Sequence, residues 1–233
     1  MIILFYSFER VIKLLKGACV CGFGVLLNLW FLSAHAADDY PYRTIVTKNG
    51  SEVAEYRGVR FAESPDRQRR WKAPRAVSAV EVLNEWPPIC TQGEGNRQWY
   101  QAVAEGVGAA KTVIPATPKS SEDCLFLNLW RPLNAQSSDL PVMVWIHGGG
   151  NVGGWSFEPN YRGPELAADG VVVVSIAYRL GVFGFLAHPD LTRETSYASS
   201  GNYGFLDQLE ALRWVQAHIE KFGGDANNVT VFG

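Results

Sequence analysis

Residues 142–154 read Val-Met-Val-Trp-Ile-His-Gly-Gly-Gly-Asn-Val-Gly-Gly, so five apolar residues run directly into a cluster of glycines. A short apolar run of this kind suits an interior strand of a sheet that is covered on both faces. Consecutive glycines let the backbone approach a ligand closely and turn its N–H groups outward, as a developing oxyanion requires. A flexible turn or a phosphate-binding loop is also rich in glycine, but the Gly-Lys-Ser/Thr of a phosphate loop does not occur here. The position of the turn after the strand, and the preceding His147, favour a turn that stabilises an oxyanion over both alternatives.

Strand and helix patterns alternate around this stretch. Apolar or β-branched runs at 125–130, 171–176 and 229–232 are predicted as further strands. A short helix is predicted at 164–168, and a long one at 205–222, where apolar residues recur every three or four positions. Strands that alternate with helices imply an α/β fold with a mostly parallel central sheet.

The ends of these elements carry their own signals. Asn49-Gly50 lies between two β-rich runs and predicts an antiparallel N-terminal hairpin over residues 42–56, with positive φ angles in the turn. Asn202 is predicted to cap the long helix and Gly223-Gly224 to end it. Residues 94–121 lose periodicity and collect Gly, Pro and Ser, which predicts a surface loop.

The first 36 residues have the composition of an export signal. Three basic residues precede the mostly apolar run 23–32, and Ala34-His-Ala36 follows it. This order predicts a signal peptide over residues 1–36, cleavage after Ala36 and a secreted or periplasmic protein. A membrane anchor is the alternative, but the run from residue 17 to 32 is shorter than the roughly 18 to 20 apolar residues that span a bilayer. Lipidation of Cys19 is a weaker option because Lys16 occupies a position where that signal has an apolar residue.

Charge excludes two classes of partner. The 21 Lys and Arg against 23 Asp and Glu give a formal net charge of -2, without any dense basic tract. Nucleic acid and anionic membrane surfaces are therefore not expected partners, and no stable membrane insertion is expected. The residues also suggest no cofactor and no metal.

Two of the four cysteines remain after the predicted cleavage, Cys90 and Cys124. An even pair in an exported protein predicts a disulfide, and two buried thiols are the alternative. A disulfide would close a loop of about 35 residues, worth roughly 3 to 4 kcal/mol on the chain-entropy model.

The chain resembles the type B carboxylesterases and cholinesterases over nearly all of residues 37–233. The resemblance is carried by five motifs in the family's order: Glu122-Asp-Cys-Leu-Phe-Leu-Asn-Leu-Trp-Arg-Pro132, His147-Gly-Gly-Gly150, Tyr178-Arg-Leu-Gly-Val-Phe-Gly-Phe-Leu186, Gly201-Asn-Tyr-Gly-Phe-Leu-Asp-Gln-Leu-Glu-Ala-Leu-Arg-Trp-Val215, and Phe222-Gly-Gly-Asp225 before Val229-Thr-Val-Phe-Gly233. It implies the N-terminal part of an α/β-hydrolase fold.

The resemblance also implies roles for particular residues. Cys90 is expected to pair with Cys124, and Arg70 with Glu122. The backbone N–H groups of Gly149 and Gly150 are expected to point into the oxyanion hole, which the residue after the nucleophile completes. A small-molecule carboxylic ester is the implied substrate.

In that family the strand that ends in Phe-Gly continues as Glu-Ser-Ala-Gly. Gly233 would be the first glycine of this turn, so the nucleophilic serine, the acid and the histidine are expected beyond residue 233. The full-length form is expected to hydrolyse esters through an acyl-serine, and the 233-residue chain to be truncated and inactive. The alternative is a non-catalytic, cholinesterase-like module that binds a protein.

Other residues are predicted to have no catalytic role. Three of the four histidines, His147, His188 and His218, are not paired in sequence with a plausible nucleophile, so none of them is predicted to be the base. Asp207 and Glu210 are expected to be structural or solvated. Cholinesterases carry a choline-binding tryptophan shortly before the second cysteine of the loop, whereas Trp99 comes too early, so a choline site is not expected.

Overall fold

The computed structural model describes residues 39–110, 116–135 and 139–233, and the predicted signal peptide lies outside them. The strands are β1 Arg43–Val46, β2 Glu52–Arg60, β3 Ile89–Cys90, β4 Ser120–Ser121, β5 Phe126–Pro132, β6 Leu140–Ile146, β7 Val172–Ile176 and β8 Gly224–Phe232. The α-helices are α1 Gly95–Gly106, α2 Pro164–Ala167, α3 Gly181–Phe185, α4 Pro189–Glu194 and α5 Tyr203–His218, and short 3-10 turns occur at Arg67–Arg69, Pro159–Tyr161 and Ile219–Phe222.

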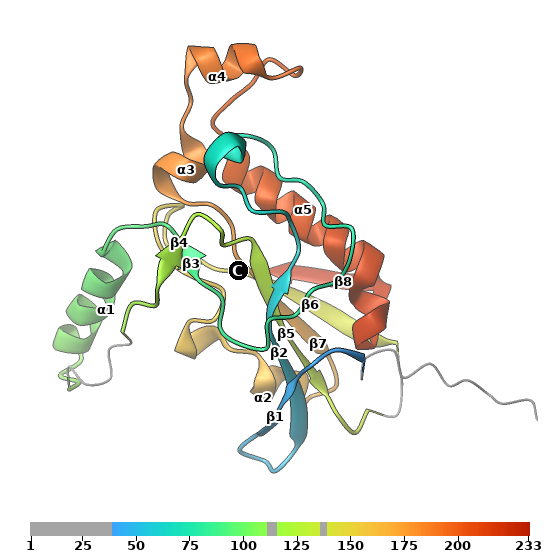
Figure 1. The fold of residues 1–233 in the computed structure, drawn as a ribbon. Helices are drawn as coiled ribbons and strands as arrows, with labels where there is room; N and C mark the ends of the chain where they lie inside the picture. The colour runs from blue at the N-terminus through green and yellow to red at the C-terminus, as the bar shows by residue number, and fades with distance from the viewer. Residues whose placement is uncertain (1–38, 111–115, 136–138) are drawn as a thin grey trace, which may run out of the picture. The chain divides into compact units, whose positions relative to one another are not determined.

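Six of these strands form one sheet in the order β1-β2-β5-β7-β6-β8 (Figure 1). The strands predicted at 125–130, 142–146, 171–176 and 229–232 are all present, as β5, β6, β7 and β8. β6 pairs in parallel with β7 and β8, whereas β1–β2, β2–β5 and β5–β7 are antiparallel. Over the described residues the sheet is thus mixed rather than mostly parallel, because the antiparallel part extends from the hairpin as far as β7.

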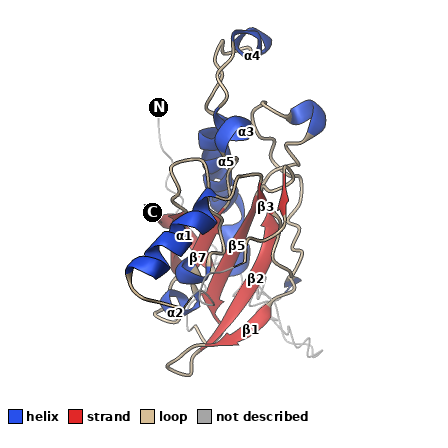
Figure 2. Cartoon of the chain, turned by 90° about the vertical axis from the view of Figure 1, so that its left-hand side faces the viewer, coloured by secondary structure: helices blue, strands red, loops and turns tan. Residues whose placement is uncertain are grey.

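Helices cover both faces of this sheet, as an α/β fold requires. Alternate residues of one strand point to opposite faces. Leu129 of β5 packs in the cluster that holds Trp214 of α5, and the next residue, Trp130, packs with Ala167 of α2. Helix α1 lies apart from these layers, to the left in Figure 1 and nearest the viewer in Figure 2.

Helix α1 corrects the prediction of an irregular loop over residues 94–121. Its twelve residues bury only two side chains, Tyr100 and Ala104, which are four positions apart. Two buried positions give the helix only a narrow apolar stripe toward the core. The helix also has a glycine at each end, Gly95 and Gly106, and glycine is typical of loops.

The N-terminal hairpin is confirmed, but its turn differs from the prediction. Val46 pairs with Glu52, so five residues join the strands. Gly50 has φ +85°, and Asn49 contributes through its side chain, whose Oδ1 accepts a hydrogen bond from the Ser51 N–H at 3.0 Å.

The long helix is also confirmed, as α5 followed by the turn Ile219–Phe222. Gly223 ends it with φ +78°, as predicted. Asn202 is the N-cap residue, but its side chain makes no capping hydrogen bond, and its backbone carbonyl accepts from the Leu206 N–H instead. In the described part of the chain, every helix is too short or too polar to cross a membrane.

Candidate active site

The glycine turn after β6 folds tightly on itself. Gly149, Gly150 and Gly154 have φ angles of +115°, +61° and +108°. A Cβ on Gly149 would overlap the Gly153 carbonyl oxygen, and one on Gly154 would lie 2.5 Å from the Gly148 carbonyl oxygen. Only glycine meets both demands at Gly149 and Gly154, because other residues disfavour these φ angles and have no room for a side chain.

The turn leaves backbone donors free. The N–H groups of Val152 and Gly153 both donate to the Gly149 carbonyl, at 3.1 and 3.2 Å. The N–H groups of Gly149 and Gly150, by contrast, donate to no residue in the described ranges. Two adjacent donors without a protein acceptor are what an oxygen anion needs.

The turn lies beside the end of β8. Trp145 of β6 pairs with Phe232 of β8, and a Cβ on the next residue, Gly233, would lie 2.7 Å from the Ile146 carbonyl oxygen. A hollow of about 490 Å³ opens here, lined among others by Gly148, Gly150 and Gly233.

A second hollow of about 490 Å³ lies between the turn and α1. Gly148 and Gly149 line it from the turn, and Asn96 and Trp99 from α1. Trp99 is thus beside the glycine turn although it is early in the disulfide loop.

His147 packs against the glycine turn from the protein interior. Its ring is buried and stacks on Tyr178 with the ring centroids 4.4 Å apart, and its Nδ1 lies 2.9 Å from the Gly148 carbonyl oxygen. The Tyr178 hydroxyl donates to the His147 carbonyl at 2.9 Å. Burial lowers the pKa of His147 from 6.5 to about 4 and raises the pKa of Tyr178 to about 12. His147 is therefore a neutral, structural histidine near pH 7.

The buried His147 predicts a loss of stability in mild acid. The unfolded chain protonates this histidine near its ordinary pKa of 6.5, and the folded chain only near 4. Between these values the unfolded state binds more protons, so stability falls as the pH is lowered. The expected loss between pH 7 and pH 5 is about 2 kcal/mol. Chemical denaturation of the protein at both pH values measures it. His147→Gln should lower this pH dependence by that amount, whereas the exposed His188→Gln should not; equal slopes for His147→Gln and the parent would contradict the prediction.

The other polar residues considered from the sequence have structural contacts. The ring of His188 caps α4 and accepts from the Asp190 N–H, and His218 packs on Trp214. Asp207 is fully buried against Arg179, and Glu210 pairs with Arg213. Among the described histidines, His147 is the one that lines the hollow beside Gly233.

The disulfide and the Arg70–Glu122 pair are confirmed. Cys90 and Cys124 are bonded, with their Cα atoms 4.9 Å apart, so the alternative of two thiols is wrong. The Arg70 guanidinium binds both oxygens of Glu122, at 2.6 and 2.5 Å. A further ion pair, which no sequence pattern predicts, lies next to Cys124: the Arg60 guanidinium donates to both carboxylate oxygens of Asp123, at 2.7 and 3.1 Å.

Loss of the disulfide is expected to lower the free energy of unfolding by about 3 to 4 kcal/mol, because the unfolded chain regains the freedom of a long closed loop. The sequence separation of 34 residues sets this magnitude. Urea denaturation of the protein, with Cys90→Ser and Cys124→Ser combined, measures the loss. Dithiothreitol should shift the midpoint of the parent in the same direction and leave that of the double variant in place. If dithiothreitol left the urea midpoint of the parent unchanged, the prediction would be refuted.

A second set of unforeseen residues ties the segment after the turn to α1. Glu158 is buried and accepts hydrogen bonds from the Tyr100 hydroxyl, from Asn96 Nδ2 at 3.1 Å and from the Trp155 N–H at 3.0 Å. Gln92 binds the backbone of Gly154. No sequence motif predicts these contacts. Asn96 and Tyr100 belong to α1, the segment that was predicted as a loop, and their partners lie far away in the chain.

The comparisons with known proteins agree with this geometry. The sequence profile described as the carboxylesterase family matches residues 43–233. Fumonisin B1 esterase of Sphingopyxis macrogoltabida is 39% identical over 231 residues, which cover 95% of this chain and 40% of that protein. Para-nitrobenzyl esterase of Bacillus subtilis (strain 168) is 43% identical over 191 residues, which cover 80% of this chain and 35% of that protein.

Solved structures show the same fold. A PNB esterase matches with a TM-score of 0.65 at 37% identity, over 83% of this chain and 38% of that one. A thermophilic PNB esterase matches with a TM-score of 0.63 at 40% identity, over 82% of this chain and 36% of that one. The chain spans about two fifths of the length of these relatives. Fold and sequence together show that this chain belongs to the carboxylesterase family, with an α/β-hydrolase fold.

Proposed function

We propose that the full-length protein is a serine hydrolase of small-molecule carboxylic esters. The family match supports ester hydrolysis, and the relatives are named as esterases of different substrates. Fumonisin B1 and para-nitrobenzyl esters appear in the names of those relatives, but neither name selects a substrate for this protein.

The pair of free N–H groups at Gly149 and Gly150 carries the proposal. They belong to a turn that lines a hollow together with Gly233. In the proposed reaction, a serine from the turn that follows Gly233 attacks the ester carbonyl carbon. The carbonyl oxygen becomes negative and accepts hydrogen bonds from these amides, where a preorganised donor pair stabilises it more than water does.

The remaining steps use groups that we propose to lie beyond residue 233. A histidine takes the serine proton and gives it to the leaving alcohol, and an acid orients that histidine. Water then attacks the acyl-serine and releases the carboxylic acid, again through an oxyanion at the same amides. The described residues thus supply part of the oxyanion hole and one wall of the site.

Export is part of the same proposal. Disulfides persist mainly in oxidising compartments, and the Cys90–Cys124 bond agrees with the predicted signal peptide. Exported protein is expected to begin at Ala37 on N-terminal sequencing, and a mature protein that retains Met1 would contradict this step.

A covalent probe tests the catalytic proposal. The full-length protein is treated with a fluorophosphonate, which phosphonylates activated serines, and its turnover of p-nitrophenyl acetate is measured before and after. One label per chain, on a serine two residues beyond Gly233, and loss of turnover are expected. Absence of both labelling and turnover would reject the esterase, and a codon other than serine at that position would favour the protein-binding module.

A further inference from the structure

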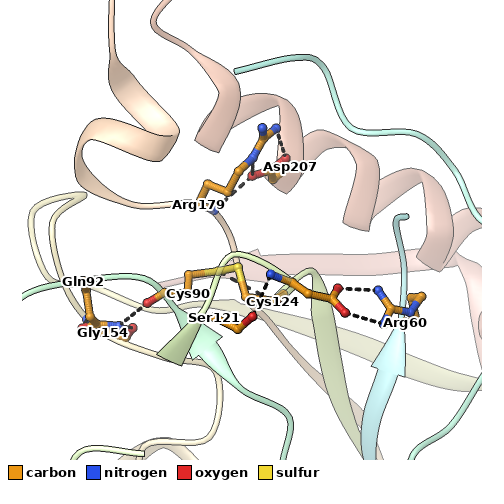
Figure 3. The surroundings of a disulfide bond; sticks show 9 residues. Arg60, Cys90, Gln92, Ser121, Cys124, Gly154, Arg179 and Asp207 are labelled. Carbon is orange, nitrogen blue, oxygen red and sulfur yellow. Dashed lines mark hydrogen bonds and ion pairs between the residues drawn. A yellow bond between two sulfur atoms is a disulfide. The ribbon is translucent and has the colours of Figure 1, made fainter. Parts of the chain in front are cut away.

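Gln92 makes a reciprocal pair of hydrogen bonds with the backbone of Gly154 (Figure 3). Its Nε2 donates to the Gly154 carbonyl at 2.8 Å, and the Gly154 N–H donates to its Oε1 at 2.8 Å. A backbone N–H can only donate, so the second bond fixes which end of the side-chain amide faces it. Gln92 therefore holds both polar groups of one residue in the glycine turn.

This pair determines the direction of the Gly153 carbonyl. The Gly153 C=O and the Gly154 N–H belong to the same peptide unit, and in a planar trans peptide they point in opposite directions. Because the N–H faces Gln92, the carbonyl faces away from it, toward Gly149, where it occupies the space that a Cβ would need. The Gly153 N–H in turn donates to the Gly149 carbonyl at 3.2 Å. Gly149 is thus enclosed by the segment that Gln92 holds.

Gln92 is itself anchored to the disulfide. Its Nε2 also donates to the Cys90 carbonyl at 3.1 Å, and Cys90 is bonded to Cys124. Gly153 packs directly on this support, since a Cβ there would lie 3.3 Å from Gln92 Oε1 and 3.4 Å from the Asn96 Cβ. Gln92 therefore links the glycine turn to the disulfide by hydrogen bonds.

We infer that Gln92 is a positioning residue of the oxyanion hole. By holding the peptide unit between residues 153 and 154, Gln92 fixes the position and direction of the Gly149 N–H group. The inference rests on the proposed esterase function and deepens it. Gln92 does not contact the substrate in this mechanism. It acts on the transition state, in which the amides donate hydrogen bonds to a negative oxygen, and hardly on ester binding, so kcat rather than KM depends on it.

Two variants of the full-length protein test this inference. Gln92→Met keeps the length of the side chain and removes both hydrogen bonds with Gly154 and the one to the Cys90 carbonyl. Gln92→Glu keeps the acceptor for the Gly154 N–H and places an oxygen against the Gly154 carbonyl. Each should lower kcat for p-nitrophenyl acetate on the order of 10- to 100-fold, because small displacements of catalytic groups have effects of this size. KM should stay within about threefold of the parent. Gln98→Met on the exposed face of α1 is the matched control and should leave kcat in place.

A second measurement separates positioning from general loss of structure. The catalytic serine attacks the carbonyl carbon of a trifluoromethyl ketone. The ketone oxygen then becomes negative and occupies the oxyanion hole. Its affinity should fall in parallel with kcat in the Gln92 variants, while the melting temperature of Gln92→Glu stays close to that of Gln98→Met. If Gln92→Met fails to fold, Gln92→Glu carries the test alone. A kcat within about twofold of the parent, or a rise in KM at unchanged kcat, would overturn the inference. A parent without turnover would instead reject the esterase proposal itself.

Discussion

Asp207→Asn is expected to lower the free energy of unfolding by about 3 to 5 kcal/mol, the range found when one partner of a buried ion pair is removed. The Asp207 side chain is fully buried and that of Arg179 is 4% exposed. The carboxylate accepts three hydrogen bonds from Arg179: from Nε at 2.8 Å, from Nη2 at 2.7 Å and from the backbone N–H at 3.0 Å. Asparagine removes the negative charge and turns a donor group toward the guanidinium, so a buried positive charge loses its counterion.

The pair also connects α5 with the segment that supports the glycine turn. Arg179 directly follows Tyr178, whose ring stacks on His147 and whose hydroxyl binds the His147 carbonyl. Arg179 Nη2 further donates to the Lys72 carbonyl at 2.9 Å. Loss of Asp207 is therefore expected to loosen the turn as well as the helix.

Chemical denaturation of the full-length protein measures the effect. Asp190→Asn is the matched control, because Asp190 also pairs with an arginine, Arg193, but both side chains are more than half exposed. Exposed pairs of this kind contribute about 0 to 1 kcal/mol. If the Asp207 and Asp190 variants were destabilised equally, the buried pair would not be a major source of stability.

The features that the sequence predicts best are local ones. The run of five apolar residues into His147-Gly-Gly-Gly150 contains both the strand and its turn, so β6 and the turn could be placed without tertiary knowledge. The β-branched run at 171–176 likewise predicts a strand. The strand β7 is buried on both faces, so a nearly continuous apolar run is what its sequence must have. The cysteine pair was predictable because Cys90 and Cys124 are the two cysteines outside the predicted export signal.

The features that the sequence does not predict depend on distant partners. Helix α1 buries Tyr100 against Glu158, 58 residues later, and Gln92 meets Gly154, 62 residues later. Residues so far apart in the chain form no local pattern that identifies them as partners. The burial of Asp207 has the same origin, because an aspartate on a helix has no local pattern that distinguishes a solvated side chain from one paired with Arg179.

Gly149→Ala is expected to lower kcat for p-nitrophenyl acetate on the order of 10²- to 10³-fold in the full-length protein, the effect of losing one donor of an oxyanion hole. A Cβ at this position would overlap the Gly153 carbonyl oxygen, and the φ of +115° is one that alanine rarely adopts. The backbone must therefore shift, and the Gly149 amide with it. KM should change little, because the amide acts mainly on the negative oxygen of the transition state.

The neighbouring Gly150→Ala separates this steric effect from a general sensitivity of the turn. A Cβ on Gly150 meets no atom within 4 Å, and its φ of +61° lies in the left-handed region that alanine occupies at a cost of about 1 to 2 kcal/mol. Its N–H can stay in place, so kcat is expected to remain within about fivefold of the parent. Equal losses at the two glycines would show that position 149 has no special steric role. Turnover of Gly149→Ala within about threefold of the parent would contradict the assignment of the Gly149 N–H to the oxyanion hole, because loss of one such donor lowers kcat far more than that.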